Sequence, residues 1–573
     1  MPNKQNKADN QDQMSKSEID VLVVGAGFAG MYAVHRFRNQ GLKVQVFEAG
    51  SDVGGTWYWN RYPGARCDVP SLEYSYGFSK ELQDEWDWPE VFSSQVDILA
   101  YANFVADKFD LRKDIQFNTR VSAVTWLEEE RLWELSTEAG EKHRAPFCVM
   151  ATGCLSVPNT PKLPGAENFK GDVLHTGMWP KESVDLSTKR VGVIGTGSSG
   201  VQSIPELAQQ SAHLTVFQRT PVYTIPANRK AMRADIQDEF RKNFETIREL
   251  QQNNTGGISN FQRRRPRDFK TKQSDRTSVL VTGVGSSAEN QSDKAPGIKD
   301  LTESERRAIV EHRGPGVLLS YRDVYNDPHA NEIANELYRE FVAREVDDPD
   351  TAESLMPRTY GIGCKRQVLD RDYYPTFNRD NVTLVDLQDA PIEEITANGV
   401  RVNGTVHELD VLVYATGFDA MTGALLRANI TGRDGQTLND KWAYGPVTFL
   451  GLQMSGFPNL FTVTGPGSPS VLCNMFVAIE QHLNWIGDCI EYMHSNGLHS
   501  IEPMSESEQR WIAHVNEVAE GTTYTAPSCN SWYLGANIPG KTRIFMPYVG
   551  GYPRYKAHCD HESNTNYEGF ALA

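Results

Sequence analysis

Two stretches of the chain repeat one pattern of apolar positions and glycines. From Ile19 to Gly50, and again from Lys189 to Pro221, an apolar β-branched run leads into G-x-G-x-x-G, a helix-compatible segment and a second apolar run. The glycines are Gly25, Gly27 and Gly30 in the first copy and Gly195, Gly197 and Gly200 in the second. The second run ends 23 positions after the first glycine in both copies, at Glu48 and Gln218. This spacing predicts two dinucleotide-binding β-α-β units.

The residue at the end of the second run indicates which nucleotide each unit binds. Glu48 supplies a carboxylate that can accept hydrogen bonds from free ribose hydroxyls. The second copy has no acid there, and Arg219 follows Gln218 with a guanidinium that can bind a 2′-phosphate. We therefore expect FAD in the first unit and NADPH in the second. Within the second glycine turn we expect NADPH to contact Thr196, Ser198 and Ser199.

The wider pattern predicts an α/β fold with two Rossmann-like dinucleotide-binding domains and a helical insertion. The run "FCVMATG" at 147–153 has a near-copy, "VLVYATGF", at 411–418, which suggests that the first domain is discontinuous. We expect an FAD domain at 18–150 and 415–573 and an NADPH domain at 151–226 and 331–414. The remaining predictions are a disordered tail at 1–17 and a helical insertion at 227–330, with a flexible polar excursion at about 253–300.

The stretch "GGTWYWNRYPGARCDVP", Gly54 to Pro70, is rich in glycine and proline and predicts a loop. Gly55 permits close approach of a ligand, and Trp57 and Trp59 offer flat faces. Asp68 lies close in sequence to Arg66. Two interpretations stay open: an aromatic core loop with a surface ion pair, or a loop folded over the flavin with Asp68 near the reacting centre.

Three downstream segments also carry candidate residues. Lys365 and Arg366 are adjacent cations after two glycines, which fits either surface charge or an anion site. The stretch Gly456 to Met475 predicts a strand that ends in a Gly/Pro loop, with a helix from about Asn474. A last loop, Ser528 to Lys541, carries Trp532.

Composition excludes several classes of function. The net charge of −17 argues against binding to nucleic acid or an anionic membrane. We expect no membrane span and no signal peptide, since no long apolar run and no apolar leader occur in the sequence. A cytoplasmic location is expected because the cysteine pattern fits a reducing compartment. The eight cysteines form no C-x-x-C and no zinc spacing, so a dithiol flavin reductase is disfavoured and no metal is expected. Hydrolase and metalloprotease motifs are also missing.

Two further motifs carry a resemblance to a known family. The segment "FKGDVLHTGMWP", from Phe169 to Pro180, matches F-x-G-x-x-x-H-x-x-x-W-P, and "GGTWYWNRYPGARCD" matches G-G-x-W-x-x-x-x-Y-P-G-x-x-x-D. Both are signatures of type I Baeyer–Villiger monooxygenases, which the chain resembles from about residue 18 to its end, apart from the polar excursion. The loop from Gly465 to Met475 is most similar to the phenylacetone and steroid monooxygenase branch.

The resemblance implies a reaction and roles for particular residues. NADPH would reduce FAD, O₂ would add at flavin C4a, and the peroxide would attack a ketone to give an ester or lactone. Arg366 matches the catalytic arginine, and Asp68 would orient it. Lys365 and Arg219 would hold the 2′-phosphate, while Thr220 and Trp532 would contact the same cofactor. Positions expected to contact FAD are Gly25, Gly27, Phe28, Gly30, Glu48, Gly55, Thr56, Trp57, Tyr58, Trp59, Arg66, Asp68, Tyr74, Val121 and Met475.

Alternatives to this assignment remain open. His175 lies between the two units and is expected to be structural, not catalytic. A heteroatom oxygenase that acts on thioethers or amines is the second candidate, although the W-P ending of the signature favours ketones. A non-catalytic NADPH sensor is the third, and the presence of Asp68, Lys365 and Arg366 argues against it. The expected partners are a ketone and O₂, and we expect a monomer.

Overall fold

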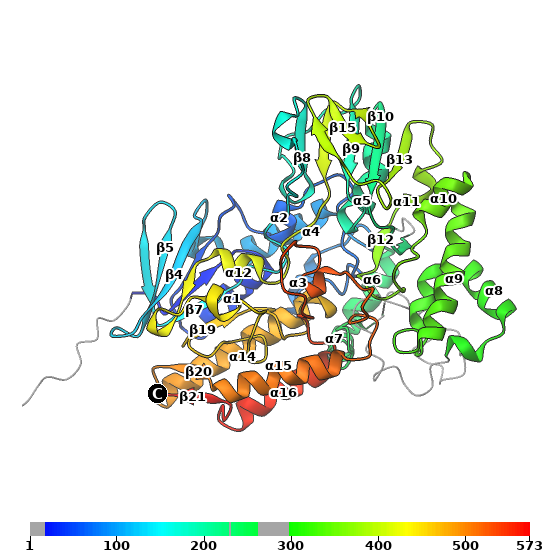
Figure 1. The fold of residues 1–573 in the computed structure, drawn as a ribbon. Coiled ribbons are helices and arrows are strands. Elements are labelled where there is room, and N and C mark those ends of the chain that lie inside the picture. The colour runs from blue at the N-terminus through cyan, green and yellow to red at the C-terminus, as the bar shows by residue number, and fades with distance from the viewer. Residues whose placement is uncertain (1–17, 228–230, 260, 262–296) are drawn as a thin grey trace, which may run out of the picture.

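The computed structural model describes residues 18–227, 231–259, 261 and 297–573. The expected N-terminal tail and most of the expected polar excursion, including Arg263, Arg264, Arg265 and Arg267, lie outside the described residues. Two parallel sheets organise the rest, with helices packed around each of them. Figure 1 shows these sheets as separate groups, with a helical segment beside the second and the C-terminal helices beneath the first. The predicted α/β class with two Rossmann-like units is confirmed.

The first sheet has five parallel strands in the order β19-β7-β1-β2-β3. Its strands are β1 (Val21–Val24), β2 (Val44–Phe47), β3 (Ile115–Gln116), β7 (Phe147–Met150) and β19 (Leu460–Thr462). Helix α1 (Phe28–Asn39) follows the first glycine turn and packs on α14 (Met475–Ser495). The edge strand β19 therefore comes from far downstream in the chain, as the expected discontinuity requires.

The second sheet repeats this arrangement in the order β13-β10-β9-β17-β8, again with parallel strands. Its strands are β8 (Asp172–His175), β9 (Arg190–Ile194), β10 (His213–Gln218), β13 (Val382–Asp386) and β17 (Val411–Tyr414). Helix α5 (Ser198–Gln210) follows the second glycine turn. The apolar residues of β9 and β10 are almost entirely buried, as is typical of strands covered on both faces.

The first glycine of each turn needs a conformation that other residues rarely adopt. Gly25 has φ of +101° and Gly195 has φ of +108°. A Cβ at Gly25 would lie 2.7 Å from the carbonyl oxygen of Ala151, and one at Gly195 would lie 2.6 Å from that of Ala415. The two near-copies "ATG" after β7 and β17 thus close against the two turns in the same way.

Smaller sheets complete the two units. An antiparallel sheet with one parallel edge strand, ordered β18-β4-β5-β6, flanks the first sheet. Its strands are β4 (Val121–Leu127), β5 (Leu132–Thr137), β6 (Lys142–Ala145) and β18 (Ile430–Thr431). The other strands are β11 (Thr224–Pro226), β12 (Val368–Asp370), β14 (Glu394–Thr396), β15 (Gly399–Val402), β16 (Thr405–Glu408), β20 (Ile501–Pro503) and β21 (Phe570–Leu572).

The predicted insertion is helical in the described residues. It contains α6 (Ala234–Lys242), α7 (Phe244–Gln252) and α8 (Glu303–Arg313), and the helices continue through α9 (Pro328–Glu345) and α10 (Pro349–Leu355). The boundary expected at residue 330 therefore falls inside α9. The remaining α-helices are α2 (Thr56–Trp59), α3 (Lys80–Glu85), α4 (Gln95–Lys108), α11 (Tyr373–Thr376), α12 (Gly423–Arg427), α13 (Leu438–Lys441), α15 (Ser505–Ala519) and α16 (Tyr552–Asn564). Among the described helices, none is long and apolar enough to cross a membrane.

Candidate active site

The first glycine turn leads into the N-terminus of α1. Gly27 is the N-cap residue and no side chain caps the helix, so its first N–H groups are free of a side-chain acceptor. Such an N-terminus favours a phosphate group. The buried carboxylate of Glu48 accepts hydrogen bonds from the backbone N–H of Ala26 at 2.7 Å and of Gly50 at 2.6 Å. Glu48 is thereby fixed beside the turn, where a ribose-binding residue is needed.

The loop that follows packs against this turn. Gly54 and Gly55 both have positive φ, and a Cβ at Gly55 would lie 2.7 Å from the Cα of Gly27. The sequence predicted an irregular loop here, but Thr56–Trp59 form the single helical turn α2. The indole Nε1 of Trp57 donates to the hydroxyl of Tyr74 at 3.1 Å.

An aromatic cluster joins this loop to the start of α1 and α14. The ring of Phe28 lies 4.4 Å from that of Phe476 and 6.3 Å from that of Tyr74. Met475 begins α14 next to Phe476, and Tyr58 stacks edge-on against Trp59 at 4.9 Å. Phe28, Trp57 and Tyr74 are therefore brought together at the start of α1, while Tyr58 and Trp59 pack on each other within α2.

The second glycine turn has the same open helix terminus. Gly197 is the N-cap of α5, no side chain caps it, and a Cβ there would meet no atom within 4 Å. Thr196 Oγ1 donates to the carbonyl of Thr220 at 3.0 Å, which holds the end of β10 against the turn. Ser199 Oγ hydrogen-bonds Thr176 Oγ1 at 3.0 Å. This turn can accept a second pyrophosphate.

The position that corresponds to Glu48 in the second unit faces away from the turn. Gln218 is fully buried, and its Nε2 donates to the carbonyl of Ser354 in α10 at 2.7 Å. Arg219, the next residue, is exposed. The structure thus separates a structural glutamine from an arginine that is open to a ligand.

Arg219 and Lys365 form an unneutralised pair of cations. Within the described part of the chain, neither side chain makes an ion pair with a carboxylate. Burial, and then the nearby charge of Arg219, lower the pKa of Lys365 to about 8. Two like charges held close together are stabilised by a polyvalent anion, and a phosphate monoester fits this need.

Arg366 lies where three separate segments meet. Its Nε and Nη2 donate to the two carboxylate oxygens of Asp68 at 2.6 and 2.8 Å, and its Nη1 donates to the carbonyl of Val471 at 2.5 Å. Burial is the largest single effect and disfavours the charge of Arg366, but the carboxylate of Asp68 and the side chain of Tyr533 together outweigh it and raise the pKa of Arg366 above its usual range. The result is a permanent, oriented positive charge between the two nucleotide-binding units.

A disulfide that the sequence analysis did not find fastens this region to the C-terminal loop. Cys364 bonds to Cys529, with Cα atoms 5.7 Å apart and 165 positions between them in sequence. Cys364 directly precedes Lys365, and Cys529 precedes Trp532, which is partly buried and lies 4.4 Å ring to ring from Tyr533. No local spacing signals such a pair, because the partners come together only in the fold.

Two other expected site residues lie apart from the Asp68–Arg366 pair. Arg66 pairs with Glu90 at 2.6 Å and not with Asp68. Val121 begins β4, two residues after Thr119, whose N–H donates to the carbonyl of Glu48 at 2.8 Å. Contacts of these residues with a cofactor stay predictions.

His175 occupies a structural position at the edge of the second sheet. It ends β8, its Nδ1 accepts from the N–H of Gly177 at 2.9 Å, and its Nε2 lies 3.3 Å from the carbonyl of Asn159. Burial lowers the pKa of His175, which favours the neutral imidazole. This geometry supports the expectation that His175 orders the linker.

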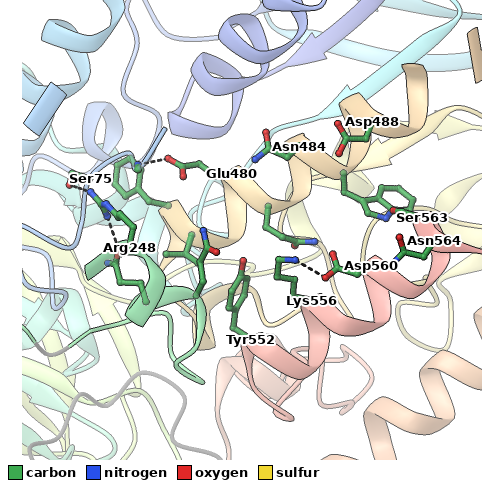
Figure 2. Close-up of a pocket in the computed structure, with 17 residues that line it drawn as sticks. Ser75, Arg248, Glu480, Asn484, Asp488, Tyr552, Lys556, Asp560, Ser563 and Asn564 are labelled. Atoms are coloured by element: carbon green, nitrogen blue, oxygen red, sulfur yellow. Dashed lines mark hydrogen bonds and ion pairs between the residues drawn. The ribbon is translucent and has the colours of Figure 1, made fainter. Parts of the chain in front are cut away.

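A polar cavity of about 430 Å³ lies between α7, α14 and α16, and Figure 2 shows the side chains that line it. None of its lining residues is among those expected to contact FAD or NADPH. Glu480 accepts from the N–H of Gly77 at 2.6 Å, and burial raises the pKa of Glu480 to about 7. Lys556 pairs with Asp560 at 2.6 Å, one turn further along α16, on the side of the cavity that this helix forms.

Comparison with known proteins places this site in a family. A family model described as flavin-binding monooxygenase-like matches residues 18–231. A Baeyer–Villiger monooxygenase of Pseudooceanicola batsensis is 39% identical over 94% of both chains, and phenazine N-monooxygenase PhzNO1 of Lysobacter antibioticus is 38% identical over 97% of both. The solved structure of an oxidized steroid monooxygenase bound to NADP is 45% identical, with a TM-score of 0.85 over 97% of this chain and 99% of that one.

Identity at this level across nearly the whole chain shows more than a shared fold. The relatives cover both nucleotide-binding units, the helical insertion and the C-terminal loop. The family that the two signatures indicated is thus confirmed. The chain belongs to the Baeyer–Villiger monooxygenases, the FAD- and NADPH-dependent flavoenzymes that convert ketones into esters or lactones.

Proposed function

We propose that this protein uses FAD and NADPH to insert one oxygen atom of O₂ into a ketone, which yields an ester or lactone. The observation that carries the proposal is the position of Arg366, held by both oxygens of Asp68 between the two glycine turns. A permanent cation at this place suits a reaction in which negative charge develops on oxygen.

The first unit fits FAD. The open N-terminus of α1 suits the pyrophosphate, and Glu48 suits the adenosine ribose. The aromatic cluster around Phe28, with Trp57 and Tyr74, offers apolar surface for a flat ring system. When bound, FAD supplies the redox chemistry and the activation of O₂.

The second unit fits NADPH better than NADH. Arg219 and Lys365 present two positive charges without carboxylate partners in the described part of the chain. Thr220 follows Arg219, and Trp532 is tied to the Lys365 segment through the disulfide. These residues are the proposed contacts of the adenosine 2′-phosphate and of the rest of the cofactor.

The contribution of the protein to the chemistry is mainly electrostatic. Arg366 stays protonated because Asp68 and Tyr533 together outweigh the cost of burial. It can therefore stabilise negative charge on the attacking oxygen and then on the carbonyl oxygen of the substrate. Asp68 fixes the direction of the guanidinium through two hydrogen bonds.

The test is turnover of the purified FAD-loaded protein with linear, aryl, cyclic and steroidal ketones, with NADPH loss and product mass followed together. The proposal expects a gain of one oxygen with ester or lactone connectivity. Arg366→Ala should still allow flavin reduction by NADPH but give no ester. Normal ester yield from Arg366→Ala would contradict the assigned role of Arg366.

A second candidate is oxygenation of nitrogen or sulfur. It is favoured by the similarity to phenazine N-monooxygenase PhzNO1, a relative as similar as those named for ketone oxygenation. The same assay with thioethers and N-heteroaromatic compounds separates the two, because N-oxides and sulfoxides differ from esters in connectivity. A sensor without catalysis would give no oxygenated product from either panel.

The strands of each parallel sheet fall within one unit of the proposed domain division, whereas its boundary at residue 330 divides α9. We assign 18–150 and 415–573 to FAD and 151–226 and 331–414 to NADPH, with the helical insertion at 227–330. A monomer in the cytoplasm remains the proposal for assembly and location, and sedimentation of the purified protein tests the first.

A further inference from the structure

We propose that Tyr360 is a positioning residue for recognition of the 2′-phosphate. Its ring contacts the ammonium group of Lys365, and its hydroxyl hydrogen-bonds the segment that contains Arg219. This inference rests on the proposed NADPH site. It adds a residue that lies outside both glycine turns and both family signatures.

The ring of Tyr360 supports the ammonium group of Lys365. Lys365 Nζ lies 4.1 Å from the centroid of the Tyr360 ring, a cation–π geometry. Within the described residues, no carboxylate pairs with this ammonium. A lysine ammonium has three N–H donors, so one can point to the ring while the other two point to an anion.

The hydroxyl of Tyr360 reaches the other half of the site. It donates to the carbonyl of Pro221 at 2.8 Å, two residues after Arg219. One buried side chain therefore touches both segments that supply the two cations. A shift of its ring would change the separation of the two positive charges.

Neighbouring contacts hold Tyr360 in place. Tyr223 Oη donates to the Tyr360 carbonyl at 3.0 Å, and the two rings meet edge to face at 5.4 Å. The N–H of Ile362 donates at 2.9 Å to Asn335 Oδ1 of α9. Helix α9 thereby anchors the segment that contains Tyr360 and holds its ring in place.

The experiment compares Tyr360→Leu, which removes the ring, with Tyr360→Phe, which keeps the ring and loses the hydroxyl. Binding of NADP⁺ and NAD⁺ to the FAD-loaded protein is measured by calorimetry, and KM for NADPH and NADH is measured beside it. Tyr360→Leu should weaken the binding of NADP⁺ roughly five- to tenfold, as expected for loss of a desolvated cation–π contact. Binding of NAD⁺ should change little. Tyr360→Phe keeps the ring under Lys365 but loses the bond to Pro221, so its NADP⁺ affinity should lie between those of Tyr360→Leu and the native protein.

Tyr373→Leu is the matched control, since Tyr373 is equally buried in the same apolar cluster but no cation lies over its ring in the described residues. In a Lys365→Ala background, Tyr360→Leu should weaken NADP⁺ binding no more than Tyr360→Phe does, because only the hydroxyl contact is left to lose.

Equal losses for NADP⁺ and NAD⁺, or additive effects with Lys365→Ala, would overturn the role of Tyr360. If Lys365→Ala itself weakened the binding of NADP⁺ and NAD⁺ equally, the proposed 2′-phosphate site would be wrong, and not the role of Tyr360.

Discussion

Asp68 and Arg366 are 298 positions apart in sequence and share two hydrogen bonds of 2.6 and 2.8 Å. The pair joins the loop after the first glycine turn to the second nucleotide-binding unit. The guanidinium of Arg366 also donates to the carbonyl of Val471 and hydrogen-bonds the side chain of Tyr533. The position of this charge therefore depends on both units being folded and in contact.

Asp68→Asn should reduce oxygen transfer while it leaves flavin reduction largely unchanged. The amide keeps the shape of the side chain but removes the negative charge that orients Arg366. Loss of a charged hydrogen bond of this kind costs about 1.5–3 kcal/mol, so the rate of product formation in a single turnover should fall roughly 10- to 100-fold. Asp84→Asn, at the exposed Lys80–Asp84 pair, is the control. An unchanged product rate would show that Asp68 does not orient Arg366.

Arg219→Ala should weaken NADPH by about 1.5–3 kcal/mol, the usual contribution of a charged hydrogen bond. NADH should be little affected because it lacks the 2′-phosphate. KM for both nucleotides in flavin reduction checks this prediction, with Arg233→Ala as an exposed control. Equal losses for both nucleotides would mean that Arg219 contacts another part of the cofactor.

Glu480→Gln should flatten the pH dependence of stability. Burial raises the pKa of Glu480 from 4.5 to about 7, so the folded state binds its proton more tightly than the unfolded chain does. The native protein therefore loses stability as pH rises from about 4.5 to about 7. Above pH 7 the variant should be more stable than the native protein by about 1–3 kcal/mol.

Denaturant unfolding at several pH values measures this effect. The facing groups are Arg248 and the N–H groups of Gly77 and Phe78, all of which favour the charged form of Glu480 and limit the gain. Asp488→Asn, farther along α14 and paired with Arg36, is the control. If the stability of the variant had the same dependence on pH as that of the native protein, the raised pKa of Glu480 would be contradicted.

Reduction of the Cys364–Cys529 bond should lower the free energy of unfolding. The bond closes a segment of 165 positions, and cross-links over loops this long contribute about 3–5 kcal/mol through the unfolded state. Thermal unfolding with and without a dithiol reductant measures the loss. Cys529→Ser should unfold early and no longer respond to the reductant, whereas Cys489→Ser should keep the native response. An unresponsive native protein would show that the bond does not form in solution.

Local patterns in the sequence predicted much of the fold and part of the site. Each glycine turn, its helix and the position of Glu48 or Arg219 lie within about 30 residues, so sequence spacing describes them. The strand that leads to the Gly465 loop and the helix capped by Asn474 were predicted for the same reason.

The relationships that the sequence could not predict involve distant partners. Adjacent Lys365 and Arg366 were compatible with surface charge, and only the resemblance to the family assigned them roles. No pattern in the sequence indicates three of these contacts. They are the hydrogen bond of Gln218 to Ser354, the Cys364–Cys529 bond and the position of the Tyr360 ring under Lys365. They depend on how the insertion and the C-terminal loop pack against the second sheet.

The edge strand β19 has a consequence for synthesis of the protein. Asn459, next to β19, donates to the carbonyl of Pro146, 313 positions earlier in the chain. A ribosome adds about 5–20 residues per second, so β7 leaves the ribosome long before β19 is synthesised. During that interval the edge of β7 that pairs with β19 has no partner strand, while the strands of the second sheet are already being synthesised. The first sheet therefore gains its edge strand β19 only after every strand of the second sheet has been synthesised.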